Sequence, residues 1–360
     1  MKKINFKNLN FYKNKKIIIT GNTGFKGAWL TMWLLSLGAK IVGISKDIPT
    51  KPSLFINANL NKKMKTFFID VSNLKKFSKV VNDFKPDIIF HLAAQSIVSK
   101  SFENPMETYL SNSIGTANLL EILRKYKKKL SAVIITSDKC YYPTKNGYYA
   151  ETSKLGGFDP YSGSKAISEL FFQNYYESFL FKKKNIKVVT ARAGNVIGGG
   201  DWTKDRILPD LFRSIINKEK FTIRNPNANR PWQHVLEPLA AYLFLARAIH
   251  LNFNKMNGHS YNIGPNLKNN LSVIQLIKKI ESMWPKIEIN YIIKNNKKFK
   301  ESKKLNLNTI KIKKDLNWKN KLKLNQICIF VVEWYKNYLL NKKNIYSFSL
   351  SQITKYSNLK

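Results

Sequence analysis

The sequence predicts an α/β protein: a Rossmann-type, doubly wound parallel sheet with a smaller, mixed α/β C-terminal domain. Two observations predict this fold class. Short apolar segments alternate with helix-length segments through the first half of the chain. A glycine-rich loop, TGNTGFKG (20–27), joins the first apolar segment to the first helix. Strands that are apolar on both faces, each followed by a helix, are typical of a parallel sheet covered on both sides.

The elements of the first half follow in order. Residues 28–38 have helical length and end on a glycine, residues 74–84 have an amphipathic pattern, and a third helix is expected near 107–126. The expected strands are KKIIIT (15–20), AKIVGIS (39–45), KTFFIDV (65–71), PDIIFHLA (86–93), SAVIITS (131–137) and IKVVTARAG (186–194).

The second half is less regular, and we expect the chain to cross between the domains more than once. A helix at 236–250, a strand at 260–264 and helices at 272–284 and 325–340 follow an irregular segment rich in glycine and arginine. The predicted divisions are a first domain of residues 13–194 with a returning segment at about 233–262, a smaller domain of 195–232 and 263–340, and a weakly ordered tail at 341–360.

Composition excludes several classes of protein. Of 360 residues, 44% are hydrophobic, and no apolar run approaches the roughly 20 residues that a membrane-spanning helix needs. The formal net charge is +40, but the lysines are scattered and accompany many asparagines and isoleucines, which A/T-rich codons supply. With no nucleic-acid-binding motif, the charge predicts attraction of small anions rather than of nucleic acid. Two cysteines without metal-binding spacing, and no signal peptide, predict a cytoplasmic protein without zinc.

The glycine loop predicts a dinucleotide site. Gly21 permits a tight turn, Gly24 lets the backbone approach a pyrophosphate, and Gly27 lets the helix pack near the sheet. The pyrophosphate is then expected at the helix N-terminus, where free N–H groups favour anions. A structural turn without a ligand is the alternative, and the strand–loop–helix context favours binding.

A second pattern predicts catalysis. Tyr161 and Lys165 form Y-x-x-x-K and lie one helical turn apart on one face. A nearby ammonium is expected to lower the pKa of the phenol, so that the tyrosinate can take a proton from a substrate hydroxyl. Upstream, a strand ends in Ser137, Asp138 and Lys139, an acid beside a base.

Together these motifs resemble the extended short-chain dehydrogenases/reductases and, among them, the nucleotide-sugar 4,6-dehydratases. The resemblance covers roughly residues 13–340 and includes TGNTGFKGAWL, PTKPSLF, HLAAQSIV, ARAGNVIGGGDWTKDRILPD and RPWQHVLEPL. Most relatives carry Ser/Thr-Asp-Glu at the strand end, whereas this chain reads Ser-Asp-Lys, which is similar to the branch acting on CDP-linked glucose. The resemblance implies a hydro-lyase of deoxysugar and surface-polysaccharide synthesis, and pairing of two copies through the helices near 107–126 and 161–181.

The resemblance implies a role for each catalytic residue. Tyr161, supported by Lys165, removes the sugar O4 proton as hydride passes from C4 to NAD; Asp138 protonates the departing C6 hydroxyl; and Ser137 binds the O4 region. The family glutamate takes the C5 proton. Lys139 can replace it only as a neutral amine, while an ammonium beside Asp138 favours the wrong, ionised form of that acid. Lys139 is therefore either the C5 base, which is our hypothesis, or a charge that stabilises the enolate.

The cofactor is expected to be NAD. Asp47, about 20 residues past the loop, can accept from a ribose 2′-hydroxyl, although Lys26 and Lys46 could instead favour a 2′-phosphate. The residues expected to contact the cofactor are Gly21, Thr23, Gly24, Phe25, Lys26, Gly27, Asp47, Asp70, Val71, Leu92, Ala93, Ala94, Gln95, Tyr161 and Lys165.

A nucleoside diphosphate is best held by arginine forks. The residues expected to contact the substrate are Ser96, Asn195, Arg206, Arg224 and Arg230. Trp232, His91 and His234 are expected to be structural, and no metal is expected. The alternatives are a dehydratase of dTDP-glucose or GDP-mannose, another UDP-sugar enzyme or 4-epimerase of this scaffold, or a non-enzymatic cofactor-binding protein; the intact catalytic set disfavours the last.

Overall fold

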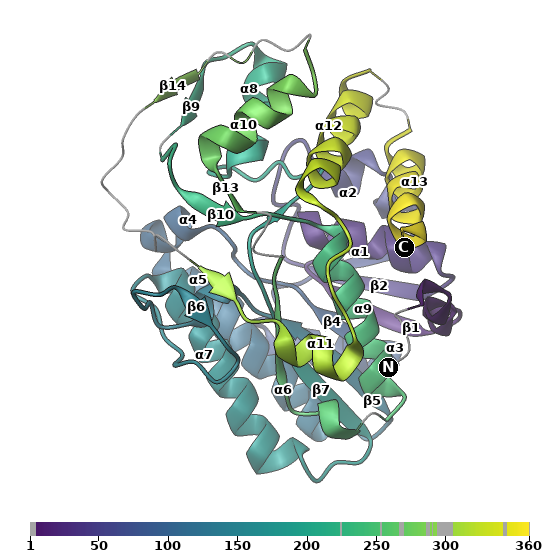
Figure 1. The fold of residues 1–360 in the computed structure, drawn as a ribbon. Coiled ribbons are helices and arrows are strands. Elements are labelled where there is room, and N and C mark those ends of the chain that lie inside the picture. The colour runs from purple at the N-terminus through teal and green to yellow at the C-terminus, as the bar shows by residue number, and fades with distance from the viewer. Residues whose placement is uncertain are drawn as a thin grey trace.

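A seven-stranded parallel sheet forms the centre of the molecule (Figure 1). The structure is a computed structural model that describes residues 5–223, 225–252, 254–265, 270–285, 289, 291–293, 305–340 and 344–359. In spatial order the strands are β12 (Ser260–Ile263), β7 (Ile186–Ala193), β5 (Leu130–Ile135), β4 (Ile88–His91), β1 (Lys16–Thr20), β2 (Lys40–Ser45) and β3 (Lys65–Phe68). The chain thus starts near the middle and winds outwards in both directions, which confirms the predicted doubly wound fold. In such sheets ligands bind beyond the carboxyl ends of the strands, where the order reverses.

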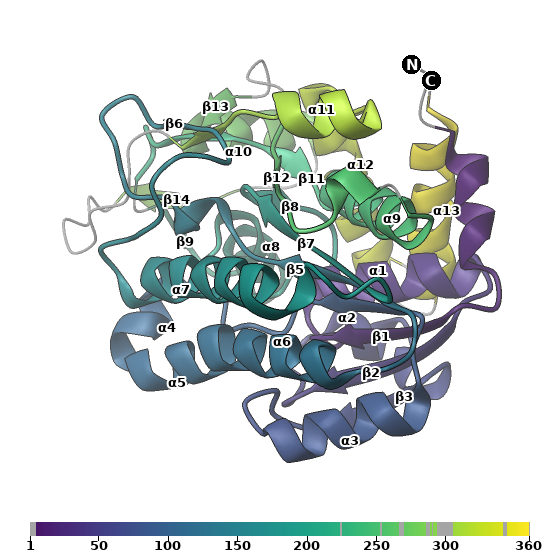
Figure 2. The same ribbon diagram turned by 90° about the horizontal axis from the view of Figure 1, so that it is seen from below.

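Helices cover both faces of the sheet (Figure 2). The helices α1 (Phe25–Ser36) and α9 (Leu236–His250) pack on one face, and α3 (Leu74–Phe84), α6 (Gly115–Lys125) and α7 (Pro160–Tyr175) pack on the other. Side chains of β1 alternate between the two cores: Ile17 and Ile19 join the first, and Ile18 joins the second. Since neighbouring side chains of a strand point to opposite faces, an all-apolar strand buries both.

The helix predicted near 107–126 is confirmed as three consecutive helical pieces. It consists of α5 (Pro105–Tyr109), a π-turn η3 (Leu110–Ile114) and α6, and a short helix α4 (Val98–Glu103) precedes it. The helix α7 likewise continues into a π-turn, η5 (Tyr176–Leu180).

Mixed α/β structure lies beyond the carboxyl ends of the strands, as predicted. The helix α10 (Val273–Ser282) begins with a capping box, in which the Ser272 hydroxyl accepts from the Gln275 N–H and the Gln275 side chain accepts from the Ser272 N–H. The helices α8 (Ile207–Asn217) and α12 (Leu324–Leu340) also lie there, whereas α11 (Ile310–Leu316) packs beside the edge strand β12. The short strands pair as β8 (Val196–Ile197) with β11 (Gln233–His234), β9 (Phe221–Ile223) with β14 (Tyr291–Ile293), β10 (Asn229–Pro231) with β13 (Asn270–Ser272), and β6 (Tyr148–Tyr149) with β15 (Asn306–Leu307). The remaining elements are η1 (Phe6–Tyr12), α2 (Leu54–Asn57), η2 (Leu60–Lys62), η4 (Asp138–Cys140), η6 (Asn254–Met256) and α13 (Ile345–Asn358).

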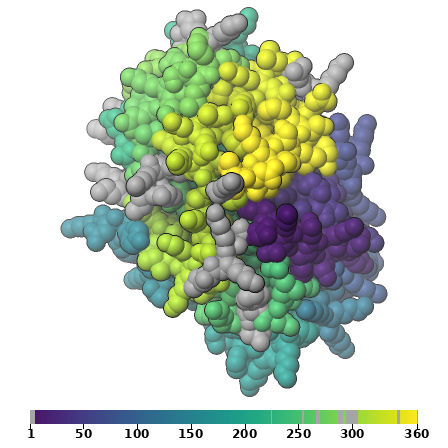
Figure 3. Space-filling model, turned by 45° about the vertical axis from the view of Figure 1, so that its right-hand side comes forward, coloured from purple at the N-terminus to yellow at the C-terminus, as the bar shows by residue number. Residues whose placement is uncertain are grey.

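The expectation of a weakly ordered tail after residue 341 is wrong. The helix α13 packs on α1 and α12, and it lies beside the N-terminal segment (Figure 3). The ring of Tyr356 meets that of Phe6 edge-on, and its hydroxyl donates to the buried Glu237 carboxylate at 2.8 Å. The sequence gives a weak signal for α13, because its large buried apolar side chains are only Ile345, Ile353 and Tyr356 and they stand among many polar residues.

Candidate active site

The predicted catalytic residues lie where β5 and β7 end and where α7 begins. After β5, Ser137 caps the single 3-10 turn η4, which carries Asp138 and Lys139. Helix α7 starts after Asp159, whose carboxylate accepts from the Ser162 N–H, with Pro160 in the first turn. This start places Tyr161 in the first turn of α7 and Lys165 in the second.

Four of the five catalytic side chains form a chain of contacts, and Lys165 lies against the end of β5. A hydrogen bond joins the Ser137 and Tyr161 side chains, and the Ser137 hydroxyl also donates to Asp138 Oδ1 at 3.0 Å. The Lys139 ammonium is 3.7 Å from Asp138 Oδ1, and the Lys165 ammonium is 3.5 Å from the Ile135 carbonyl oxygen. All except Lys139 are buried. The structure therefore brings together the five residues that the sequence nominates.

The acid–base properties differ from one expectation. Burial raises the pKa of Tyr161, although the hydrogen bond to Ser137 and the charges of Lys139 and Arg206 lower it in part. The expectation that the lysine neighbour leaves this phenol with a lowered pKa is therefore wrong for the protein alone. Burial also lowers the pKa of Lys165 to about 8, and the negative charge of Glu169 opposes that shift.

The glycine loop has the geometry of a phosphate-binding turn. Gly21 has a φ of +73°, and a Cβ there would lie 2.8 Å from the Ala93 nitrogen. A Cβ on Gly27 would lie 2.0 Å from the Gly21 carbonyl oxygen, so only glycine lets α1 start so close to the loop. Gly24 caps α1 without any side-chain hydrogen bond, which leaves the first N–H groups of the helix for a ligand. These features fit a dinucleotide pyrophosphate.

The end of β2 adjoins this loop. The Thr23 hydroxyl donates to the Asp47 carbonyl oxygen at 2.7 Å, which places Asp47 at the rim of the loop. Lys46 pairs with Asp70 at 3.5 Å and with Glu107 at 3.2 Å. Burial raises the pKa of Asp70, but hydrogen bonds from Ser72 and the Lys46 charge outweigh it and lower the pKa. Lys46 is thus engaged by two carboxylates at the position where a 2′-phosphate would need a cation.

Lys26 lies in a different place from the one that 2′-phosphate recognition requires. It is half-buried, and burial lowers its pKa to about 7; Arg206 and Lys165 lower the pKa further, while Asp138 and Asp201 raise it. These groups belong to the catalytic side of the site. The suggestion that Lys26 reads the adenosine ribose is therefore wrong.

The turn after β4 runs beside the glycine loop, as predicted for a cofactor contact. The Leu92 and Ala93 N–H groups donate to the carbonyl oxygen and the hydroxyl of Thr20. The Gln95 side chain instead donates to the Ile97 carbonyl oxygen and to the Thr108 hydroxyl on α5. Ala94 stays half-buried in this turn, and Val71 is buried against Gly115.

On the substrate side, two contacts join the turn after β4 and the following helix α4 to the segment before α8. Arg206 donates to the Ser96 hydroxyl at 3.1 Å and pairs with the buried Asp201 carboxylate at 3.2 Å. The Ser99 hydroxyl donates to Asp205 at 2.8 Å. Arg206 also acts on the pKa of Tyr161. It therefore lies at the catalytic end of the site.

The other substrate candidates are more dispersed. Gly194 ends the β7 segment, and a Cβ there would lie 3.5 Å from Asp138 Oδ2, so the neighbouring Asn195 lies at the same edge. Arg230 lies on β10 and is half-buried. Arg224 lies outside the described residues.

The residues expected to be structural are in the core. Trp232 is buried and donates to the Leu271 carbonyl oxygen. Trp202, for which the sequence left base stacking and a core position open, is also buried and packs on Tyr335. Burial lowers the pKa of both His91 and His234 to about 3. Within the part of the chain that the structure describes, no group of three His, Cys, Asp or Glu side chains could hold a metal, and no helix is long and apolar enough to cross a bilayer.

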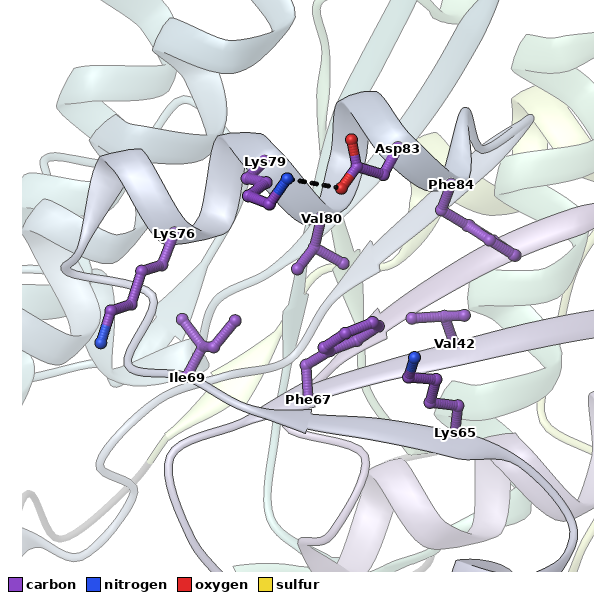
Figure 4. Close-up of a pocket in the computed structure, with 9 residues that line it drawn as sticks. All are labelled: Val42, Lys65, Phe67, Ile69, Lys76, Lys79, Val80, Asp83 and Phe84. Atoms are coloured by element: carbon purple, nitrogen blue, oxygen red, sulfur yellow. Dashed lines mark ion pairs between the residues drawn. The ribbon is translucent and has the colours of Figure 1, made fainter.

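A cavity of about 410 Å³ lies between β3 and α3 (Figure 4). Phe67 and Ile69 line it on the side of β3 and Val80 lines it on the side of α3, and Lys79 pairs with Asp83 at its edge. It shares no residue with the predicted site, so it is not the catalytic centre.

Sequence reasoning missed Asp201 and the buried pair of Glu169 and Arg192. Asp201 stands in GGGDW, and its signal is an acid inside a glycine-rich, aromatic segment. Glu169 follows Lys165 by four residues and therefore shares its helix face.

The fold and the site define the class of the protein. A doubly wound sheet, a G-x-x-G-x-x-G loop and a Y-x-x-x-K pair beside the end of β5 are those of an extended short-chain dehydrogenase/reductase.

Comparison with known proteins narrows this class. The family model for GDP-mannose 4,6 dehydratase matches residues 18–329, and the chain belongs to this family. A CDP-glucose 4,6-dehydratase of Salmonella typhimurium is 37% identical, covering 92% of this chain and 93% of the relative. A CDP-paratose 2-epimerase of Salmonella typhi is 28% identical over 74% of this chain and 83% of its own.

Solved structures share the fold. A dTDP-glucose 4,6-dehydratase of Bacillus anthracis in complex with NAD superposes with a TM-score of 0.73 at 22% identity, over 90% of this chain and 97% of the other. A UDP-glucose 4-epimerase of Thermotoga maritima with UDP-glucose gives a TM-score of 0.76 at 22% identity, over 90% and 99%.

Proposed function

We propose that the protein is a CDP-glucose 4,6-dehydratase, a hydro-lyase that uses bound NAD to make CDP-4-dehydro-6-deoxy-glucose and water for deoxysugar and surface-polysaccharide synthesis. The observation that carries the proposal is the Ser137–Asp138–Lys139 turn facing Tyr161 and Lys165. The relative with 37% identity supports the CDP-sugar assignment. The two free, buried cysteines fit a reducing compartment, and we place the reaction in the cytoplasm.

NAD suits this site. The glycine cradle admits a pyrophosphate, Asp47 lies at its rim, and the two lysines that could favour a 2′-phosphate are engaged elsewhere. NAD held in this cradle would supply reversible hydride transfer between sugar C4 and C6, so the reaction would have no net redox change. Tyr161 moves the O4 proton, and the Ser137 hydroxyl orients that oxygen.

The elimination needs Asp138 as a carboxylic acid and Lys139 as a neutral amine, and a proton transfer within the pair would supply both. As an ion pair, both residues have the wrong protonation state for an elimination. One proton transfer from the ammonium to the carboxylate creates an amine, which can take the C5 proton, and a carboxylic acid, which can protonate the C6 hydroxyl. The transfer leaves the total charge of the pair unchanged, so the burial of Asp138 does not oppose it as it would oppose a new net charge. Elimination of water then regenerates the ion pair.

The substrate diphosphate is assigned to Arg230, Arg224 and Asn195. We place Arg206 and Ser96 beside the sugar, because the hydrogen bond between them lies at the catalytic end of the site, near Tyr161.

We also propose a homodimer. Large apolar side chains are exposed along α5, η3, α7 and η5, on the same side of the sheet. They are Met106, Leu110, Ile114, Leu170 and Phe179. A second copy would cover this face, since contiguous exposed apolar surface marks interaction sites.

One assay tests the function. Purified protein is offered CDP-glucose, dTDP-glucose, UDP-glucose and GDP-mannose with NAD, and the products are screened by mass for loss of water. We expect dehydration of CDP-glucose without accumulation of reduced cofactor, and none with Tyr161→Phe. Dehydration of another nucleotide sugar only, or epimerisation without water loss, would overturn the assignment.

A further inference from the structure

A buried ion pair lies directly behind the catalytic residues. The Arg192 guanidinium, on β7, is 2.8 Å from the Glu169 carboxylate, on α7, and both side chains are fully buried. Two charges are costly to bury unless their hydrogen bonds are satisfied. Because a buried ion pair contributes little to net stability, we looked for a role of Glu169 and Arg192 in the neighbouring catalytic site.

The Glu169 carboxylate is saturated with donors. Besides Arg192, it accepts from Thr136, from Thr190 at 2.9 Å and from Ser260 at 3.0 Å. These donors come from the segment after β5, from β7 and from β12. A carboxylate has about four acceptor sites, so Glu169 is fully occupied as an acceptor and is not arranged for proton transfer.

The pair contacts both ends of the catalytic turn. Thr136, held by Glu169, immediately precedes Ser137. At the other end, Arg192 donates to the Tyr141 hydroxyl at 2.9 Å and lies over its ring. The turn of residues 137–140 is thus flanked by Thr136, which is hydrogen-bonded to Glu169, and by Tyr141, which is hydrogen-bonded to Arg192.

Glu169 also faces Lys165 from the next turn of the same helix. Its charge raises the pKa of Lys165 against the effect of burial, which leaves that pKa at about 8. The other titratable groups around Lys165 include Cys140 and Tyr161, whose pKa values burial raises, and His91, which is neutral above a pKa of about 3. Lys26 carries a like charge only below its pKa of about 7. The negative charge of Glu169 therefore favours the protonated form of Lys165.

We propose that Glu169, fixed by Arg192, is a positioning residue that keeps Lys165 protonated and holds the Ser137–Asp138–Lys139 turn in register with Tyr161. The inference rests on the proposed function for its kinetic consequence. The effect on Lys165 itself does not depend on the substrate.

The test compares neutral variants. Glu169→Gln removes the negative charge but leaves Arg192 unpaired, so Glu169→Gln/Arg192→Gln is made in parallel to remove both buried charges. Glu169→Asp retains the charge. The matched control is Glu237→Gln, because Glu237 is a buried acid on α9 that bonds Lys321, Leu322 and Tyr356 and contacts none of the catalytic residues.

Two readouts are measured on each folded variant. The first is the pKa of Lys165 without substrate, from the pH dependence of its acetylation by acetic anhydride, followed by peptide mass spectrometry. The second is the pH profile of kcat with CDP-glucose. Without Glu169 the ammonium loses its proton at lower pH, so we expect both midpoints to fall by about one pH unit. We expect kcat at neutral pH to fall at least tenfold, with little change in Glu169→Asp.

An unshifted Lys165 titration in the folded double variant would overturn the proposal, and so would an equal shift in Glu237→Gln. A shifted titration in a protein that dehydrates no CDP-glucose would uphold the positioning role while contradicting the proposed function.

Discussion

At the scale of single residues, Lys139 and Asp138 are the pair on which the elimination depends, 3.7 Å apart at the end of β5. If one proton is exchanged within the pair, neither residue is useful alone. We expect Lys139→Ala and Asp138→Asn each to lower kcat about 100-fold or more. The double variant should be hardly slower than either, since residues that act as a unit are not additive.

Incorporation of solvent deuterium at sugar C5 measures the step directly. It should be lost in Lys139→Ala and normal in Lys154→Ala, an exposed lysine of the same loop region. Exchange at the wild-type rate in Lys139→Ala would show that another group takes the C5 proton.

Lys26 makes a second prediction at this scale. Its pKa falls from about 10.5 in the unfolded chain to about 7 in the folded protein, so the folded state binds fewer protons between these values. Stability is therefore reduced below pH 7, and the penalty declines as pH rises from 7 to 10.5. We expect Lys26→Met to raise the free energy of unfolding by about 1–2 kcal/mol at pH 6, after allowance for its partial exposure.

That gain should vanish near pH 10, while activity should fall below pH 7, where Lys26 is charged and the methionine lacks the charge beside Asp138. Urea unfolding at pH 6, 8 and 10 measures the effect. A gain that is independent of pH would mean that methionine acts through packing alone.

At the scale of elements, two glycines of the loop have different roles: Gly27 is needed for stability and Gly24 for ligand binding. A Cβ on Gly27 would lie 2.0 Å from the Gly21 oxygen, which forces α1 away from the sheet, whereas a Cβ on Gly24 meets the same oxygen at 3.4 Å. We expect Gly27→Ala to lower the free energy of unfolding by about 1–3 kcal/mol.

Gly24→Ala serves as the matched control. It should leave stability nearly unchanged but weaken NAD binding, because its methyl group would occupy the approach to the pyrophosphate. Thermal unfolding and NAD titration of both variants check this contrast. Equal destabilisation by the two substitutions would contradict it.

At the scale of the whole molecule, the exposed apolar face of α5, η3, α7 and η5 predicts the oligomeric state. The formal charge of +40 opposes self-association through like-charge repulsion, so an interface needs a substantial apolar centre. We expect a dimer in analytical ultracentrifugation and a monomer after Met106→Glu/Leu170→Glu. Ile310→Glu, an exposed apolar site on α11, should leave the dimer intact, and a wild-type monomer would contradict the proposal.

The sequence by itself determined the central sheet, its helices, the glycine loop and the Tyr161–Lys165 pair. Apolar segments such as 15–20 and 131–137 can bury both faces only between two layers of helices, and the spacing of Gly21, Gly24 and Gly27 or of Tyr161 and Lys165 is local. Local spacing is kept on folding, which is why Tyr161 and Lys165 could be predicted from it, whereas the roles of Ser137, Asp138 and Lys139 came from the resemblance to the dehydratases.

The tertiary structure alone decided what depends on groups distant in sequence. Burial raised the pKa of Tyr161 where proximity to a lysine suggested the opposite, and Arg206, Asp201 and Asp138 revealed that Lys26 belongs to the catalytic end. The ordering of α13 required Glu237 and Phe6 as partners, and the Glu169–Arg192 pair required β5, β7 and β12 to meet. Desolvation and Coulomb interactions depend on distances through space, and no periodicity along the chain records those distances.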